Sequence, residues 1–170
     1  MLDVLSIPFE KEKSSDELTE VKKMIYVLDG LCDLIMFEVP LEQDPEGTIT
    51  SEWELARMEI ANTLNRIASI EAEEVKNMEP TEEDKMIYGA ENASPLQRLY
   101  KNGNRNLKAV NQSIVPHTLV SLLTDEAVRR SSTDTMISVL EALTAISIYQ
   151  PITEKIIAQG VGRDLVRIIN

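Results

Sequence analysis

The hydrophobic positions of the C-terminal half form a pattern that occurs twice. Residues 112–123 read QSIVPHTLVSLL and residues 159–169 read QGVGRDLVRII, each a turn of small or helix-breaking residues followed by a Leu-Val helix face. Gln112 and Gln159 are 47 residues apart. Between them, apolar residues at positions 136, 139, 140, 143 and 146 have the spacing of a helix with one buried face. The pattern predicts a helical repeat with a long helix over residues 134–149.

The N-terminal half contains two further apolar stripes at helical spacing. Residues 1–16 are polar and contain Pro8, which predicts a lead-in without a helix. A helix is expected from about residue 17 to 37, followed by a loop to residue 50. Ser51 and Glu54 have the spacing of a capping box, which predicts a helix over residues 52–70. Its expected buried stripe is Leu55, Met58, Ala61, Leu64, Ile67 and Ala68.

Acidic residues then dominate an expected connector, residues 71–93. A short helix over residues 82–88 with Thr81 as its cap is expected inside it, and Ser94-Pro95 has the pattern of a helix start. Further helices are predicted over residues 106–112, 116–124, 152–159 and 163–170. Residues 17–170 are therefore expected to form one all-α domain, with Leu64, Leu119, Leu143 and Ile146 in its core.

Composition and charge indicate which classes of protein and partner the chain fits. The chain has 170 residues, 43% hydrophobic and 27% charged, which is typical of a soluble globular domain. No apolar run is long enough to cross a membrane, no signal peptide is evident, and the single cysteine fits the cytoplasm. Residues 1–91 hold 23 acidic and 8 basic residues, a net charge of −15, which disfavours nucleic acid and anionic membranes as partners. The acids at 71–84 either solvate a connector or dock a basic partner.

Three features of the sequence suggest a metal or catalytic site, but none has the full set of residues that such a site needs. Residues 42–54 resemble a calcium loop, but Trp53 stands where a bidentate carboxylate is needed. His117 is the only histidine and Cys32 the only cysteine, so neither has a second ligand of its kind for zinc. We therefore expect no catalytic residues, no bound metal and no cofactor. Cys32 is expected to be a core residue and His117 a surface or capping residue.

The order of short helix, turn, middle helix, loop and long amphipathic helix resembles the armadillo repeat family. Residues 113–123, 141–147, 159–169 and, more distantly, 60–68 carry this resemblance. It implies a right-handed α-solenoid of about three repeats, the last one incomplete, that serves as a non-enzymatic scaffold or adaptor for another protein. In that family the third helices line a groove for extended peptides, often through an asparagine late in the helix. Arg66 and Ala145 occupy the matching positions here.

The expected partner-binding residues follow from this resemblance and from the C-terminal sequence. They are Asn62, Arg66, Glu141, Thr144, Ala145, Leu165, Ile168 and Ile169. The last unit lacks a third helix, so its apolar residues predict a patch that a partner, a second copy or further sequence covers. Two alternative functions stay open: a structural subunit of a large cytoskeletal or ciliary assembly, and a calcium-responsive helical module that uses residues 42–54.

Overall fold

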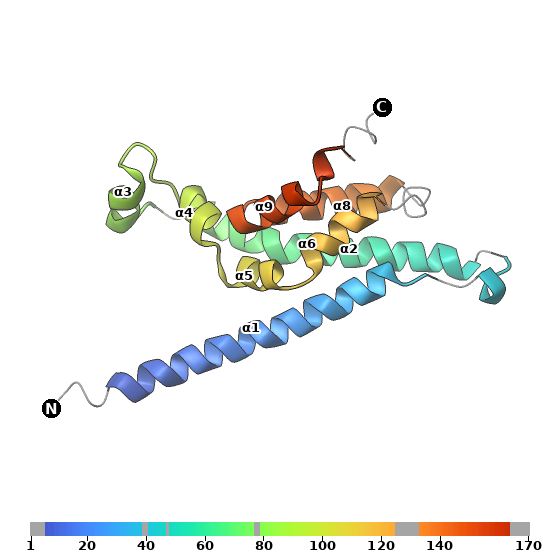
Figure 1. Cartoon of the computed structure of the whole chain (residues 1–170), viewed down its shortest axis with the longest axis horizontal. Helices are drawn as coiled ribbons and strands as arrows, with labels where there is room; N and C mark the ends of the chain where they lie inside the picture. The colour runs from blue at the N-terminus through green and yellow to red at the C-terminus, as the bar shows by residue number, and fades with distance from the viewer. Residues whose placement is uncertain (1–5, 39–40, 47, 77–78, 125–132, 164–170) are drawn as a thin grey trace.

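Helices form all the regular secondary structure in the described residues of this chain (Figure 1). The computed structural model describes residues 6–38, 41–46, 48–76, 79–124 and 133–163. Its α-helices are α1 (Ser6–Met36), α2 (Thr48–Lys76), α3 (Glu82–Tyr88), α4 (Pro95–Asn102), α5 (Arg105–Gln112), α6 (Val115–Thr124), α8 (Thr133–Ile146) and α9 (Gln150–Ala158), and η1 (Leu41–Gln43) is a 3₁₀ helix. The predicted all-α class is confirmed.

The first two helices are longer than the sequence pattern predicted. Helix α1 begins at Ser6, so the expectation of a non-helical lead-in over residues 1–16 is wrong from Ser6 onward. Pro8 lies in the first turn of α1, where its missing N–H removes no helical hydrogen bond. Helix α2 begins at Thr48 and continues to Lys76. Ser51 is therefore inside the helix rather than its cap, and residues 71–76 are helical rather than part of a connector.

The helix starts predicted around residues 81 and 94 are confirmed. Thr81 caps α3 through a capping box: its hydroxyl accepts from the Asp84 backbone N–H at 3.1 Å, and the Asp84 carboxylate accepts from the Thr81 backbone N–H at 2.9 Å. Ser94 caps α4, and Pro95 occupies its first turn. Arg98 of α4 lies 3.7 Å from the Asp84 carboxylate, which links the two helices.

This capping box makes α3 sensitive to acid. Hydrogen bonds from the Thr81 hydroxyl and backbone, with a smaller contribution from Arg98, lower the pKa of Asp84 below its usual range. Because the folded pKa is depressed, the stabilisation of α3 is complete above the usual aspartate pKa of about 3.9 and is lost as pH falls through the lower folded pKa. A carbon-detected NMR titration of Asp84 should give a pKa below about 3.9, and Asp84→Asn should abolish the acid-dependent fraying of α3. An Asp84 pKa at or above that value would contradict this assignment.

The C-terminal half follows the prediction closely. Helices α5, α6, α8 and α9 begin and end within about three residues of the predicted bounds. Asn104 caps α5 by accepting from the Leu107 backbone N–H at 2.8 Å. Residues 125–132, between α6 and α8, lie outside the described residues, as does most of the predicted helix over residues 163–170.

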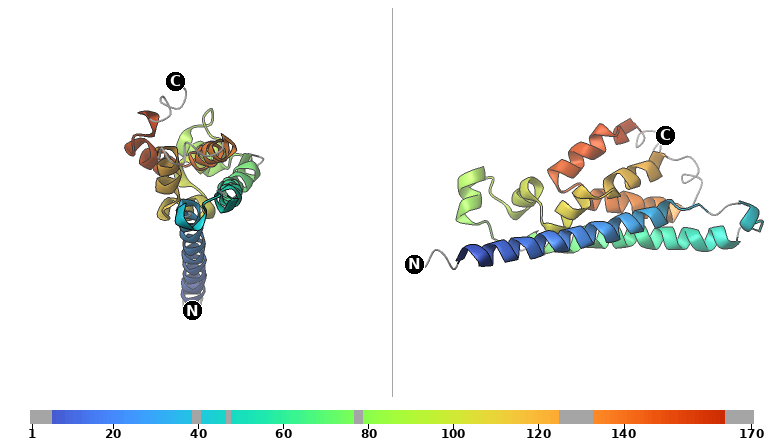
Figure 2. Two further views of the ribbon diagram at one scale, coloured as in Figure 1. Left: turned by 90° about the vertical axis from the view of Figure 1, so that its right-hand side faces the viewer. Right: turned by 60° about the horizontal axis from the view of Figure 1, so that its bottom comes forward.

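Two antiparallel helix pairs stack on each other and form the body of the molecule (Figures 1 and 2). The first pair is α1 with α2, and the second is α6 with α8. Helices α1 and α6 run in the same direction, and so do helices α2 and α8. Along α1, Asp29 accepts from the Ile114 backbone N–H at 2.9 Å, and Cys32, one turn further on, lies beside Thr118. Along α2, Glu54 lies beside Thr135 near the helix start, whereas Asn65 and Ser69 lie near Thr144.

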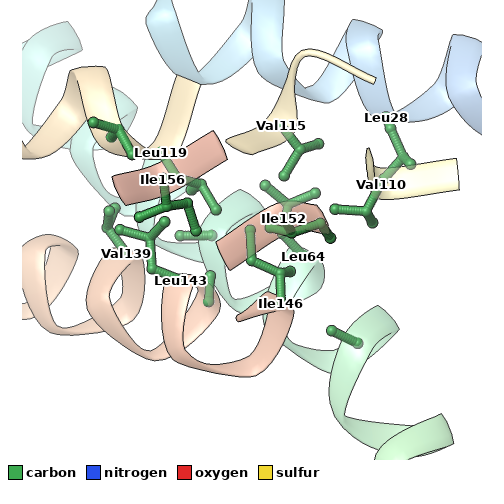
Figure 3. Packing of buried hydrophobic residues seen from close by; sticks show 14 of the residues in the cluster. Leu28, Leu64, Val110, Val115, Leu119, Val139, Leu143, Ile146, Ile152 and Ile156 are labelled. Atoms are coloured by element: carbon green, nitrogen blue, oxygen red, sulfur yellow. The ribbon is translucent and has the colours of Figure 1, made fainter. Parts of the chain in front are cut away.

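The core fills the space between these pairs (Figure 3). The four residues predicted to be buried are at most 6% exposed, which confirms that part of the prediction. Cys32 is also fully buried, as expected. Leu55 is 63% exposed, so its assignment to the buried stripe is wrong. The buried side of α2 instead follows Arg57, Ala61, Leu64 and Ala68.

Candidate functional site

A hollow of about 440 Å³ lies along the seam between α2 and α8. Among the described residues, seven line it: Asn65, Ser69, Ile137, Leu140, Glu141, Thr144 and Ala145. Because α2 and α8 run side by side in the same direction, successive turns of both helices present side chains along one straight seam. We call this hollow the α2–α8 groove.

The α2 side of the groove is polar. Asn65 and Ser69 are one helical turn apart and therefore lie on the same face of α2. The Ser69 hydroxyl donates to the Asn65 side-chain oxygen at 2.9 Å, which fixes the orientation of the amide. The Asn65 side-chain nitrogen then has no partner among the described residues, so it is available as a donor to a ligand.

The α8 side combines an apolar surface with two polar groups. Ile137 is 48% exposed, and Leu140 and Ala145 are half-buried beside it. Glu141 is exposed and makes no ion pair within the described part of the chain. The Thr144 hydroxyl donates to the Leu140 carbonyl at 2.8 Å, so its oxygen remains able to accept a hydrogen bond.

The structure places only part of the predicted partner-binding set in this groove. Among the predicted residues, Glu141, Thr144 and Ala145 line it. Asn62 is half-buried and Arg66 is exposed on α2, but neither lines the groove. Leu165, Ile168 and Ile169 lie outside the described residues. The described part of the predicted set is therefore divided between the groove and other positions on α2.

Four groove residues were absent from the predicted partner-binding set: Asn65, Ser69, Ile137 and Leu140. Alignment with the repeat pattern selected Arg66 on α2, one residue away from Asn65. One residue corresponds to a rotation of about 100° around a helix, which is enough to move a side chain out of the groove. The available signal was the i, i+4 pair of small polar residues next to the buried positions Leu64 and Ala68.

The segment that resembles a calcium loop has a different geometry. Helix α2 begins at Thr48, so the second half of residues 42–54 is helical and cannot wrap around an ion. Asp44 is buried at 6% exposure. No group of three or more carboxylate, histidine or cysteine side chains suited to a metal occurs within the described residues. Residues 48–54 therefore differ from the continuous loop that the calcium alternative requires.

The single cysteine and single histidine occupy structural positions. Burial is the main cause that raises the pKa of the Cys32 thiol to about 11, and a hydrogen bond with Thr118 opposes this shift. The thiol is therefore protonated at neutral pH, which makes it a poor nucleophile. His117 is exposed at the start of α6, and its Nδ1 lies 3.1 Å from the Gln159 side-chain oxygen. This contact joins α6 to the turn after α9.

Two further findings concern membrane spans and similarity to known proteins. None of the described helices combines the length and the apolar character that a membrane span requires. Comparison of the chain with models of protein families, with curated proteins and with solved structures finds no match.

Proposed function

We propose that this chain is a non-enzymatic scaffold of armadillo-like helical repeats that binds a segment of another protein in the α2–α8 groove. The stacking of two antiparallel helix pairs, with equivalent helices parallel, supports a solenoid-like arrangement. In such an array, the pair α1–α2 forms one layer and the pair α6–α8 forms the next. The groove then lies on the face that successive long helices share.

The groove chemistry is the observation that carries this proposal. An extended peptide exposes backbone N–H and C=O groups that need partners, and its side chains alternate in direction. The Asn65 amide nitrogen supports binding of a peptide carbonyl, and the Thr144 hydroxyl oxygen supports binding of a peptide N–H. The apolar surface of Ile137, Leu140 and Ala145 suits one apolar side chain of the peptide.

The charge of the groove sets the preferred partner. Glu141 is an exposed acid on the groove wall without an ion pair among the described residues, so a lysine or arginine in the peptide would complement it. Glu59 and Asp134 are further exposed acids on the same two helices, with Arg66 as an exposed base. We therefore expect the bound segment to carry a positive charge next to an apolar residue.

Selection from a library of extended peptides tests this function. Peptides enriched on the immobilised chain should contain a basic residue close to an apolar one, and their affinity can be measured by fluorescence polarisation. Ala145→Arg fills the groove and should weaken binding by at least about tenfold. Ala158→Arg makes the same change at an exposed position of α9, outside the groove, and should leave the affinity unchanged. Enriched peptides that bind both variants like the unmodified chain would refute the proposal.

A further inference from the structure

Helix α1 carries a second apolar face that the rest of the described chain leaves largely open. Its inner face contributes Leu28, Cys32 and Ile35 to the core. Away from this inner face, four apolar side chains are exposed: Tyr26 is 81% exposed, Val27 62%, Leu34 49% and Phe37, directly after the helix, 52%. We call these four residues the outer α1 face. Val27 lies at its edge, where it lines a hollow with Ile67, and the Phe37 ring makes a T-shaped contact with the Trp53 ring. Lys22, Lys23 and Asp33 are also exposed on α1, so its exposed side is mixed. Four large apolar side chains on the exposed side of one helix still indicate an interface.

The position of α1 leaves this face open along its length. Figure 1 shows α1 along one edge of the molecule, and the end-on view in Figure 2 shows the other helices on one side of it. Gly30 lies in the middle of the outer α1 face and is exposed. A Cβ atom added at Gly30 would meet nothing within 4 Å. A glycine in this position lets another helix approach the backbone of α1 closely.

The charges on both sides of Gly30 identify the occupant. Lys23 is exposed on α1 seven residues before Gly30, and Glu38 is exposed two residues beyond the end of α1, eight residues after Gly30. Neither makes an ion pair within the described part of the chain. In an antiparallel pair of α1 helices that cross at Gly30, Lys23 of each copy lies close to Glu38 of the other. A parallel pair would instead place Lys23 against Lys23 and Glu38 against Glu38, which is unfavourable.

The apolar residues fit the same register. Tyr26 lies four residues before Gly30 and Leu34 four residues after it, so they face each other across the antiparallel pair. Phe37 lies seven residues after Gly30, opposite Lys23, whose aliphatic stem can cover the ring. A surface that is complementary to itself under a twofold rotation is the requirement for a symmetric dimer. We propose that a second copy of this chain covers the outer α1 face, in an antiparallel α1–α1 contact centred on Gly30.

Reversal of the two charges tests the register. Sedimentation equilibrium of the full chain from about 1 to 300 µM should show a monomer–dimer equilibrium, since this range covers micromolar affinities. Lys23→Glu alone and Glu38→Lys alone should each weaken the dimer by roughly tenfold, because each creates a like-charge contact. The double variant Lys23→Glu/Glu38→Lys restores opposite charges across the twofold axis and should recover the original affinity. A chain that stays monomeric over this range, or single variants that dimerise like the unmodified chain, would overturn the proposal.

Cross-linking at the predicted crossing point provides an independent readout. The thiol that Gly30→Cys introduces would face its own copy in the dimer and should form an intermolecular disulfide under mild oxidation, because the two backbones are close there. The natural Cys32 is buried and should not compete. Thr63→Cys places a thiol at an exposed position of α2 and should give no such dimer. Equal cross-linking of both variants would show random collision and refute the register.

Discussion

Replacement of Arg57 by methionine should lower the free energy of unfolding by about 3 kcal/mol, because it removes the buried partner of a part-buried ion pair. Arg57 is 6% exposed on α2. Its Nε donates to the Ile35 carbonyl at 2.8 Å, and its Nη2 donates to the Phe37 carbonyl at 3.0 Å. Its Nη1 contacts the Glu54 carboxylate at 2.7 Å. The variant would leave the Ile35 carbonyl without its side-chain donor, whereas Trp53 Nε1 still donates to the Phe37 carbonyl at 2.9 Å and the Thr135 hydroxyl still donates to Glu54 at 3.3 Å.

Guanidinium denaturation of matched variants measures this effect. Arg66→Met makes the same change at an exposed position of the same helix, and it should change stability by less than about 0.5 kcal/mol. The double variant Arg57→Met/Glu54→Leu removes both charges and should be less destabilised than the sum of the two single changes. An Arg57→Met variant as stable as Arg66→Met would show that water replaces the guanidinium without loss.

Truncation of Leu143 to alanine should cost about 2–5 kcal/mol through the cavity that it leaves in the core. Leu143 is 6% exposed on α8. Figure 3 shows it in the cluster near Val139 and Ile146 of its own helix. The tight packing of helices α2, α6 and α8 around this position limits how far the structure can collapse into the vacated space.

The matched control is the same substitution at Leu55, which is 63% exposed on α2. Leu55→Ala should change the free energy of unfolding by less than about 0.5 kcal/mol. Thermal and chemical denaturation of the two variants should therefore differ clearly. Similar large losses at both positions would mean that Leu55 is covered in solution, and similar small losses would mean that the core position of Leu143 is wrong.

Local signals in the sequence predicted α5, α6, α8 and α9 and the starts of α3 and α4. Thr81, Ser94 and Asn104 each accept from a backbone N–H of the helix that follows. The extent of α1 and α2 was less predictable. Pro8 and the acidic residues after residue 70 suggested helix ends, yet a proline is tolerated in a first turn and acidic residues remain good helix formers.

The candidate groove needed the three-dimensional arrangement. The resemblance to the armadillo repeat assigned residues 60–68 and 141–147 to equivalent positions, but the rotation of each helix about its axis depends on its neighbours. Arg57 shows why the sequence pattern did not predict the rotation of α2 about its axis. Its guanidinium occupies a buried position of α2 because the carbonyls at the end of α1 need donors, and a count of apolar residues cannot detect that requirement. The same count assigned Leu55 to the core and left Asn65 unnoticed.

The stacking of the two helix pairs also has a consequence for how the chain folds. The contacts that cover α1 and α2 join residues far apart in the sequence: Glu54 with Thr135 are 81 residues apart, and Asp29 with Ile114 are 85 apart. During synthesis, the first pair therefore leaves the ribosome long before its covering layer. Its apolar side must remain exposed until α6 and α8 have been made, which makes this interval the period of greatest risk for aggregation.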